Sequence, residues 1–284
     1  MDEKDLELLC ALHEHGSVTR AATSVFITQS ALTRRLQSLE QELGAELVIR
    51  SRQGVRLTPA GEIAVHSAKQ ALRILCDMRE QIDAQRGEIC GSLRLGVSVN
   101  YAAYRLPELL SAFHKQYPKV RIQLTTGHSR NLYEHLCSGQ LDAAILRGDF
   151  SWDDNRFLIA QEHMCVICSK DYAYTPLSQY PYIGRETDSA MSQLMSRWLR
   201  EQGLERLQPE LHVDSLTACM ALAGRGLGWA IVPEIGLHDF RGEIRRCSFE
   251  DGQPFLRKTW LLSSRGAAQL PQVHVFTEFI RQNA

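Results

Sequence analysis

A tight turn between two short helix patterns constrains the fold of this chain more than any other sequence feature. Ser17 stands where an N-cap is expected before a short helix, and Thr28 is the expected N-cap of a second helix, from Gln29 to about Leu43. Gly44 is the expected stop of this second helix. Apolar residues at helical spacing give it a predicted inward face, formed by Ala31, Leu32, Leu36 and Leu39. This order of elements predicts a helix-turn-helix.

The exposed start of the second helix carries side chains that suit double-stranded DNA. These residues are Gln29, Ser30, Thr33 and Arg34. Glutamine pairs bidentately with adenine and arginine with guanine, while serine and threonine hydroxyls reach bases or phosphates. The alternative is that such residues are only solvated, and for Arg35 and Arg56 both readings stay open.

Local charge supports a DNA partner, although the whole chain has a net charge of −1. Between Arg20 and Ala60 there are six arginines and three glutamates, a local charge of +3. The segment from Leu47 to Thr58 predicts a hairpin that turns at Gln53–Gly54. Arg50 and Arg52 of this hairpin are expected beside the reading helix, at phosphates or in the minor groove.

A long helix is predicted from Pro59 to about Gln85, with Thr58 as its N-cap. Its length is on the order of 40 Å. The apolar residues of the stripe are Ile63, Val65, Ala68, Ala71, Leu72, Leu75, Met78 and Ile82. An isolated helix with such a stripe needs a partner, and the chain's own second domain is one alternative. Residues 86–88 are the predicted hinge.

From residue 90 onward, strand and helix patterns alternate, which predicts a mostly parallel sheet covered on both faces. The predicted strands and helices are Ser92–Val97, Leu106–Tyr117, Val120–Leu124, Asn131–Ser138, Ala143–Leu146, Met164–Ser169, Ser189–Gly203 and Leu211–Val213. Ligands of such sheets bind beyond the carboxyl ends of the strands, where helices begin.

Polar residues at these strand ends are the candidates for binding a small-molecule effector. They are Ser98, Asn100, Thr126, His128, Arg147, Arg185 and Ser189. Hydroxyls and amides at helix starts, together with Arg147, favour a small anion such as a carboxylate. Each residue taken alone is more commonly a helix cap or a polar loop residue.

The front of the chain resembles the winged helix-turn-helix of LysR-type transcriptional regulators. The resemblance rests on Gly16-Ser17, Ala21-Ala22, residues 28–33, Leu39-Glu40, Leu43-Gly44, Leu47, Arg50 and residues 57–61, in the family's order and spacing. One departure is Val48, where the family usually has an aromatic residue, and a slightly looser wing is expected. Residues 93–96 and 226–233 resemble the family's effector domains more loosely.

The resemblance implies an α/β multidomain fold. It predicts a winged helix-turn-helix DNA-binding domain over residues 1–58, a linker helix and hinge over 59–89, and an effector domain over 90–284. The effector domain would have two Rossmann-like lobes, like a periplasmic binding protein. Lobe I covers residues 90–160 and 263–284, and lobe II covers 161–262. Crossover strands are expected near Phe157–His163 and Lys258–Leu262.

The function implied is a sequence-specific DNA-binding transcription regulator, modulated by a small metabolite bound between the lobes. The residues expected to contact DNA are Gln29, Ser30, Thr33, Arg34, Arg50 and Arg52. The long helix would pair with its copy in a homodimer, and the family precedent favours a homotetramer. Effector binding would change how subunits meet, and with it the contact with RNA polymerase. No cofactor is implied.

Other classes of protein find less support. No apolar run approaches the roughly 18 residues of a membrane span, and the acidic start, Met1 to Asp5, is unlike a secretory signal. We therefore expect a cytoplasmic protein whose eight cysteines are reduced. A solute-binding protein of a transport system would account for the back half only.

An enzyme is disfavoured because the sequence has no nucleophile elbow, phosphate-binding glycine loop or paired metal motif. Cys165 and Cys168, with His163 before them, have the spacing of a metal or redox pair. They lie in a strand pattern, however, in which positions three apart point to opposite faces. We expect two buried cysteines and no metal site.

Overall fold

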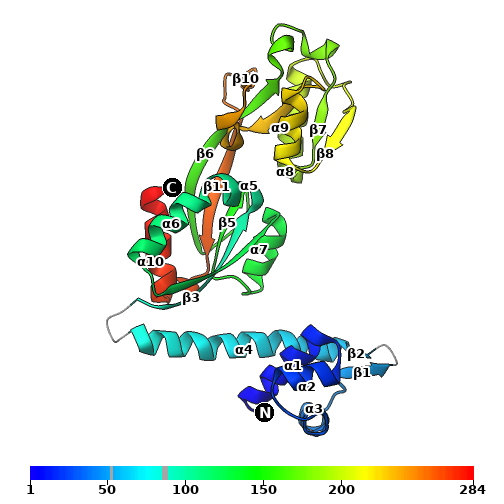
Figure 1. Cartoon of the computed structure of the whole chain (residues 1–284), viewed down its shortest axis with the longest axis vertical. Helices are drawn as coiled ribbons and strands as arrows, with labels where there is room; N and C mark the ends of the chain where they lie inside the picture. The colour runs from blue at the N-terminus through cyan, green and yellow to red at the C-terminus, as the bar shows by residue number, and fades with distance from the viewer. Residues whose placement is uncertain (52–53, 85–88) are drawn as a thin grey trace. The chain divides into compact units, whose positions relative to one another are not determined.

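The computed structural model describes residues 1–51, 54–84 and 89–284. The chain forms two compact units, Met1–Gly87 and Glu88–Ala284, which we call the head unit and the effector unit. In the head unit, α1 (Glu3–His15), α2 (Val18–Ser24) and α3 (Gln29–Leu43) surround a small apolar core (Figure 1).

Local chemistry sets the ends of the head helices. The side chains of Ser17 and Thr28 accept hydrogen bonds from the amides of the third residue after each, as N-caps do. Gly16 and Gly44 end α1 and α3 in the left-handed conformation, with φ of 56° and 66°. The predicted helix-turn-helix is therefore present.

One predicted inward residue of α3 is wrong. Leu32, Leu36 and Leu39 are buried, but Ala31 is exposed. The three leucines follow each other at spacings of four and three residues and so form one stripe, whereas Ala31 lies about 100° away from Leu32 around the helix.

A two-stranded wing follows α3. β1 (Val48–Ser51) pairs antiparallel with β2 (Gly54–Leu57), so the predicted hairpin is present, although Arg52 and Gln53 lie outside the described residues. The Val55 amide donates to the Gly16 carbonyl at 2.9 Å, and a Cβ at Gly54 would lie 2.5 Å from that same oxygen. Only glycine fits there, so the turn after α1 holds the wing in place.

Helix α4 (Pro59–Ala84) has two apolar faces instead of the single stripe expected. Val65 and Ala68 are buried against the head core, where α1 packs on α4. The apolar side chains on the other side are exposed: Ile63, Ile74, Met78 and Ile82. The head thus covers only part of the apolar surface of α4.

Lobe I of the effector unit is a sheet with helices on both faces. β3 (Gly91–Ser98) lies between β4 (Val120–Gly127) and β5 (Ala143–Arg147) and runs parallel to both. One apolar core lies under α5 (Val99–Tyr104), α6 (Leu106–Gln116) and α10 (Pro271–Asn283). Another lies under α7 (Ser129–Cys137), across the sheet.

Two long antiparallel strands connect lobe I with lobe II. β6 (Asn155–Cys168) pairs with β11 (Leu256–Ser263) along its first part, and β11 also pairs with β5. The second part of β6 pairs with β9 (Ala230–Pro233) and β10 (Glu243–Arg246) of lobe II. The two crossovers were predicted, and the strand predicted from Met164 to Ser169 is present to Cys168 as the second part of β6, which is continuous with the first crossover.

The sheet is mixed, not mostly parallel. Lobe II adds the parallel pair β7 (Ile183–Arg185) and β8 (Leu211–Val213), with α8 (Ser189–Glu201) and α9 (Leu216–Gly224). All pairings of β6 and β11 are antiparallel. Strand patterns reveal burial but not direction, which depends on how the crossover strands return.

Cys165 and Cys168 are both buried, and they belong to apolar clusters on opposite faces of β6. The predicted opposition of the two thiols is confirmed. Burial raises the pKa of the Cys165 thiol to about 12, so it is protonated at neutral pH. A protonated thiol is a poor nucleophile and a poor metal ligand.

Phe26, in the turn of the helix-turn-helix, has a costly conformation. The Phe26 amide donates to the Thr23 carbonyl and the Ile27 amide to the Ala22 carbonyl, which is the bonding pattern of a Schellman motif. In this motif the residue after the C-cap adopts the left-handed conformation, and Phe26 has φ of 56°. Glycine or asparagine is usual there, and the Phe26 side chain is 95% exposed.

We predict that Phe26→Asn stabilises the head unit by about 1 kcal/mol, because asparagine tolerates the left-handed region better than phenylalanine. The measurement is urea unfolding of the full chain by far-UV circular dichroism. The tryptophans Trp152, Trp198, Trp229 and Trp260 all belong to the effector unit, so the fluorescence transition should not move. A lower stability of the head would contradict the prediction.

Candidate DNA interface and effector site

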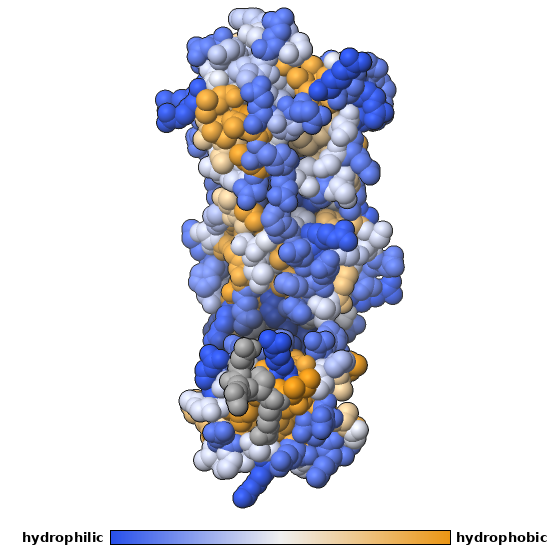
Figure 2. All heavy atoms as spheres, turned by 90° about the vertical axis from the view of Figure 1, so that its right-hand side faces the viewer, coloured by the Kyte–Doolittle hydropathy of each residue, from blue (hydrophilic) through white to orange (hydrophobic). Residues whose placement is uncertain are grey.

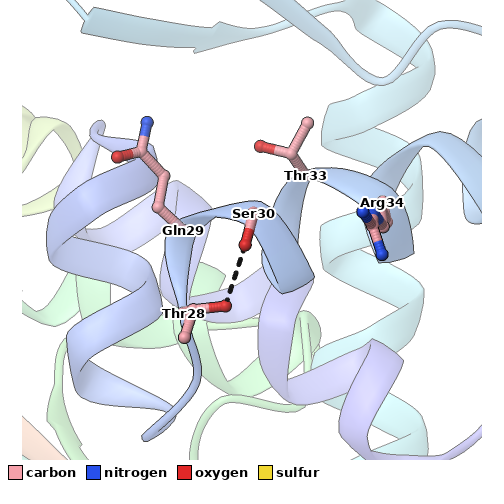
Figure 3. A pocket seen from close by; sticks show the side chains of 5 residues that line it. All are labelled: Thr28, Gln29, Ser30, Thr33 and Arg34. Atoms are coloured by element: carbon pink, nitrogen blue, oxygen red, sulfur yellow. Dashed lines mark hydrogen bonds between the residues drawn. The ribbon is translucent and has the colours of Figure 1, made fainter.

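The start of α3 forms an open polar surface. Five residues line a hollow of about 600 Å³ there: Thr28, Gln29, Ser30, Thr33 and Arg34 (Figure 3). Gln29 and Thr33, one turn apart, point to the same side of α3, while the Ser30 hydroxyl lies 3.1 Å from that of Thr28. The four residues of α3 that are predicted to contact DNA are therefore together and accessible, and their contact with DNA stays a prediction.

The arginines of the head differ in their surroundings. Arg34 is exposed and makes no hydrogen bond or ion pair within the described part of the chain. Arg35 instead pairs with Asp2 and Asp5 of the head. Arg50 lies in β1, and its side chain, like all of Arg52, is outside what the structure describes.

The surface around the wing is partly apolar. Figure 2 faces the side of the molecule on which β1 and β2 lie, and hydrophobic residues (orange) gather there among hydrophilic ones. Ile49 of β1 is exposed in this part of the head. The wing thus presents more than charge to a partner.

In the effector unit, Arg147 is the most deeply buried of the predicted effector residues. It ends β5, is 4% exposed, and donates from Nη2 to Oε1 of Glu162 on β6. Oε2 of Glu162 accepts from the Ile235 amide at 2.6 Å. Burial raises the pKa of Glu162, but both of its oxygens accept hydrogen bonds, which favours the ionised form. Burial lowers the pKa of Arg147 to about 10, so it too stays charged at neutral pH.

A second ion pair lies beside the first. Arg257 of β11 donates through Nη2 to the Asp188 carboxylate and, at 2.9 Å, to the Arg147 carbonyl. Asp188 also accepts from the Met191 amide as the N-cap of α8. Arg257, of a crossover strand, therefore bonds both to the end of β5 in lobe I and to the start of α8 in lobe II.

Arg185, at the end of β7, carries a positive charge that these two pairs do not balance. Its Nε is buried without a hydrogen-bond partner, and no ion pair to Arg185 is found in the described residues. Burial lowers its pKa, and the charge of Arg257 acts in the same direction. Together, Arg147, Arg185 and Arg257 exceed Glu162 and Asp188 by one charge.

The other predicted effector residues are less closely connected. Ser98, 5% exposed at the end of β3, has an Oγ for which the described residues offer no partner. Asn100 lies in α5, Thr126 and His128 are exposed at the end of β4, and Ser189 is exposed at the start of α8. No hydrogen bond within the described chain joins these four to Arg147 or Arg185.

Sequence reasoning missed Glu162, Asp188, Arg257 and Ser129. The Ser129 hydroxyl accepts from the Arg147 amide at 3.0 Å. A signal existed for two of them, because Glu162 and Arg257 are charged residues in or next to the predicted crossover strands. Asp188 also carried a signal, because aspartate directly before a predicted helix start is a common N-cap, and the predicted helix begins at Ser189.

A second hollow, of about 720 Å³, lies on lobe II between α9, the 3₁₀ helix Glu234–Asp239 and the segment after β6. None of the predicted effector residues lines it. It is separate from the buried charges at the crossover.

Comparisons with known proteins agree with this architecture. Residues 4–62 match the bacterial regulatory helix-turn-helix of the lysR family, and residues 86–284 match the LysR substrate binding domain. The chain belongs to the LysR family of transcriptional regulators. This LysR-type regulator therefore has a DNA-binding head and a substrate-binding domain, and its relatives are regulators, not enzymes.

Relatives cover the regulator from end to end. The HTH-type transcriptional regulator YraN of Bacillus subtilis (strain 168) is 33% identical over 99% of this chain and 98% of its own. The HTH-type transcriptional activator IlvY of Haemophilus influenzae is 28% identical over 82% of this chain and 84% of its own. Full-length CbnR in complex with its target DNA is similar in fold, with a TM-score of 0.71, 21% identity and full coverage of both chains.

A full-length OxyR variant from Pseudomonas aeruginosa has a TM-score of 0.70 at 23% identity and covers 100% of this regulator and 96% of its own chain. These likenesses establish the fold. Within the described residues, no helix combines the length and the apolarity needed to span a bilayer.

We predict that Arg147→Met destabilises the effector unit by about 3 kcal/mol, because it leaves the buried Glu162 carboxylate without its cation. The double variant R147M/E162M, which removes both charges, should recover most of this loss. Tryptophan fluorescence during urea unfolding reports the effector unit alone. A single variant as stable as the native chain would show that Glu162 does not need Arg147.

Proposed function

We propose that this regulator reads a specific DNA sequence with the start of α3 and responds to a small anion at the junction of its lobes. Gln29, Ser30, Thr33 and Arg34 would enter the major groove, with Arg50 and Arg52 of the wing at phosphates or the minor groove. The observation that carries the DNA part is the open polar surface at the start of α3, where Arg34 is exposed and makes no hydrogen bond or ion pair among the described residues.

The buried charges support an anionic effector. A buried guanidinium with an unpartnered Nε is costly, and a carboxylate or phosphate oxygen at Arg185 would supply both the missing acceptor and the missing negative charge. Ser98, at the end of β3, offers a second unpartnered polar atom at the strand ends. The further candidates Asn100, Thr126, His128, Arg147 and Ser189 would line the approach.

Response to the effector follows from the position of the ion pairs. Arg147, Glu162 and Arg257 belong to strands that meet where lobe I passes into lobe II. An anion that binds one arrangement of the lobes better than another shifts the population towards it. Closed lobes would then change how subunits meet, and hence the contact with RNA polymerase.

The assembly we propose is a homodimer through α4, and further pairing to a homotetramer follows the family precedent. Exposed Ile74, Met78 and Ile82 recur every four residues and form an apolar stripe that the head leaves open. A second α4 would cover it. Such a regulator acts on DNA in the cytoplasm.

The DNA proposal is tested by binding of the full chain to the duplex upstream of its own gene and to a random duplex, at two salt concentrations. We expect Arg34→Ala to weaken binding to the upstream duplex by about 1–3 kcal/mol and to relax base preference at one position. Arg206→Ala, which removes an exposed cation of lobe II, is the matched control and should bind as the native chain does.

Equal losses on both duplexes would make Arg34 a phosphate contact. If the native chain binds both duplexes alike and added salt abolishes both, the proposal of sequence-specific reading fails.

The effector proposal is tested by calorimetric titration with a panel of small mono- and dicarboxylates. We expect Arg185→Gln to weaken binding of any carboxylate found by about 2 kcal/mol, because a charge-assisted hydrogen bond is lost. Arg206→Gln serves again as the charge-matched control. Binding of only neutral or cationic metabolites would contradict an anionic effector.

A further inference from the structure

Arg35 lies next to Arg34 in sequence but is bonded to the start of α1. Neighbouring residues on a helix point about 100° apart, so the two side chains cannot share one face. Nε of Arg35 donates to Oδ1 of Asp5, and Nη2 donates to Oδ2 of Asp2. The Asp5 side chain is 11% exposed and that of Arg35 33%, so this ion pair is partly buried.

The two carboxylates that Arg35 contacts already hold each other in place. Asp2 is the N-cap of α1, and its Oδ1 accepts from the Asp5 amide at 3.0 Å. Oδ2 of Asp5 accepts from the Asp2 amide at 2.7 Å, which completes a capping box. Each carboxylate therefore uses one oxygen for the cap and presents the other to Arg35.

Because four oxygens are engaged in this way, the guanidinium of Arg35 is committed to α1. The hydrogen bond from Arg35 to Asp5 raises the pKa of Arg35. The pKa of Asp2 is lowered by the Asp5 amide and by Arg35, although desolvation acts in the opposite direction. A DNA phosphate would have to displace two carboxylates to reach Arg35.

The position of Arg35 on α3 makes this bond a restraint on rotation. Leu32, Leu36 and Leu39 bury one stripe of α3, which sets the face that α3 turns to the core. Arg35 lies beside Leu36 at the edge of the stripe and ties that edge to the start of α1. Any roll of α3 would turn Gln29 and Arg34 away from their present direction.

We propose that Arg35 is a positioning residue for DNA binding: its bonds to Asp5 and Asp2 hold the rotation at which α3 presents its polar start. It makes no phosphate contact. This inference rests on the proposed function, in which the start of α3 meets DNA.

The decisive variants are Asp5→Asn and Asp2→Asn in the full chain. Asparagine keeps an oxygen for the capping box and is as good an N-cap as aspartate, but it removes the charge that Arg35 binds. If Arg35 touched phosphate, neutralising Asp5 would free the guanidinium and remove a repulsive charge, so DNA binding would tighten. If Asp5 instead holds Arg35 in position, Asp5→Asn should weaken binding to the upstream duplex by about tenfold, a loss of about 1.4 kcal/mol.

Glu7→Gln is the matched control for charge. Glu7 is an exposed residue of the same helix, with no ion-pair partner among the described residues, and its change removes the same negative charge. We expect Glu7→Gln to bind the upstream duplex as well as the native chain or slightly better. Circular dichroism of each variant checks that α1 and α3 remain folded.

Arg35→Met and Arg34→Ala give an independent readout, the dependence of affinity on salt. Loss of a phosphate contact reduces the slope of log K against log salt by about 0.9, whereas loss of a positioning residue leaves it unchanged. The double variant D5N/R35M should lose no more affinity than either single one, since both remove the same bond. The exchanged pair D5R/R35D should recover part of the loss.

The outcomes separate the two proposals. If Arg34→Ala weakens specific binding but Asp5→Asn leaves it equal or tighter, or if Arg35→Met lowers the salt slope by about 0.9, the positioning role is overturned. If Arg34→Ala has no effect on specific binding either, the proposed reading by α3 fails, and the inference fails with it.

Discussion

The continuity of β6 is the constraint on which the effector unit depends. The strand spans Asn155–Cys168, pairs with β11 in its first part and with β9 and β10 in its second, and so belongs to the sheets of both lobes. Only the last five residues of β6, Met164–Cys168, are fully buried, whereas its middle is partly exposed. Glu162 stands there, and Arg147 from the end of β5 neutralises it. The ion pairs Arg147–Glu162 and Arg257–Asp188 therefore lie where one lobe passes into the other.

Charges buried at such a junction are expensive for stability, and apolar residues would pack there at lower cost. Two pairs offset part of the desolvation, and Arg185 remains as a cation without an ion-pair partner in the described chain, although its Nη1 donates to the Glu186 carbonyl. A site with one uncompensated charge is poorly satisfied when empty and well satisfied by an anion. In the proposed function, the same groups that make the junction unfavourable alone would provide selectivity for an anion, and their bonds across the lobes would make lobe geometry sensitive to it.

Much of the head could be predicted from the sequence because its determinants are local. A cap such as Thr28 bonds to an amide three residues away, and the spacing of Leu32, Leu36 and Leu39 is a property of one helix. The exposed polar start of α3 follows from the same spacing. In the effector unit the two crossovers and most strand–helix units were predictable for this reason, as was the opposition of the two thiols on β6. The roles of the residues that meet DNA or effector rest on experiment.

The sequence by itself determined where helices begin and end, which faces are apolar, and which residues lie at strand ends. Tertiary structure alone decided strand direction and the partner of each charge. Arg35 and Asp5 are 30 residues apart, and Arg257 and Asp188 are 69 apart, so no local pattern links either pair. Periodicity encodes the face on which a side chain lies, whereas the identity of its partner depends on how distant segments pack together.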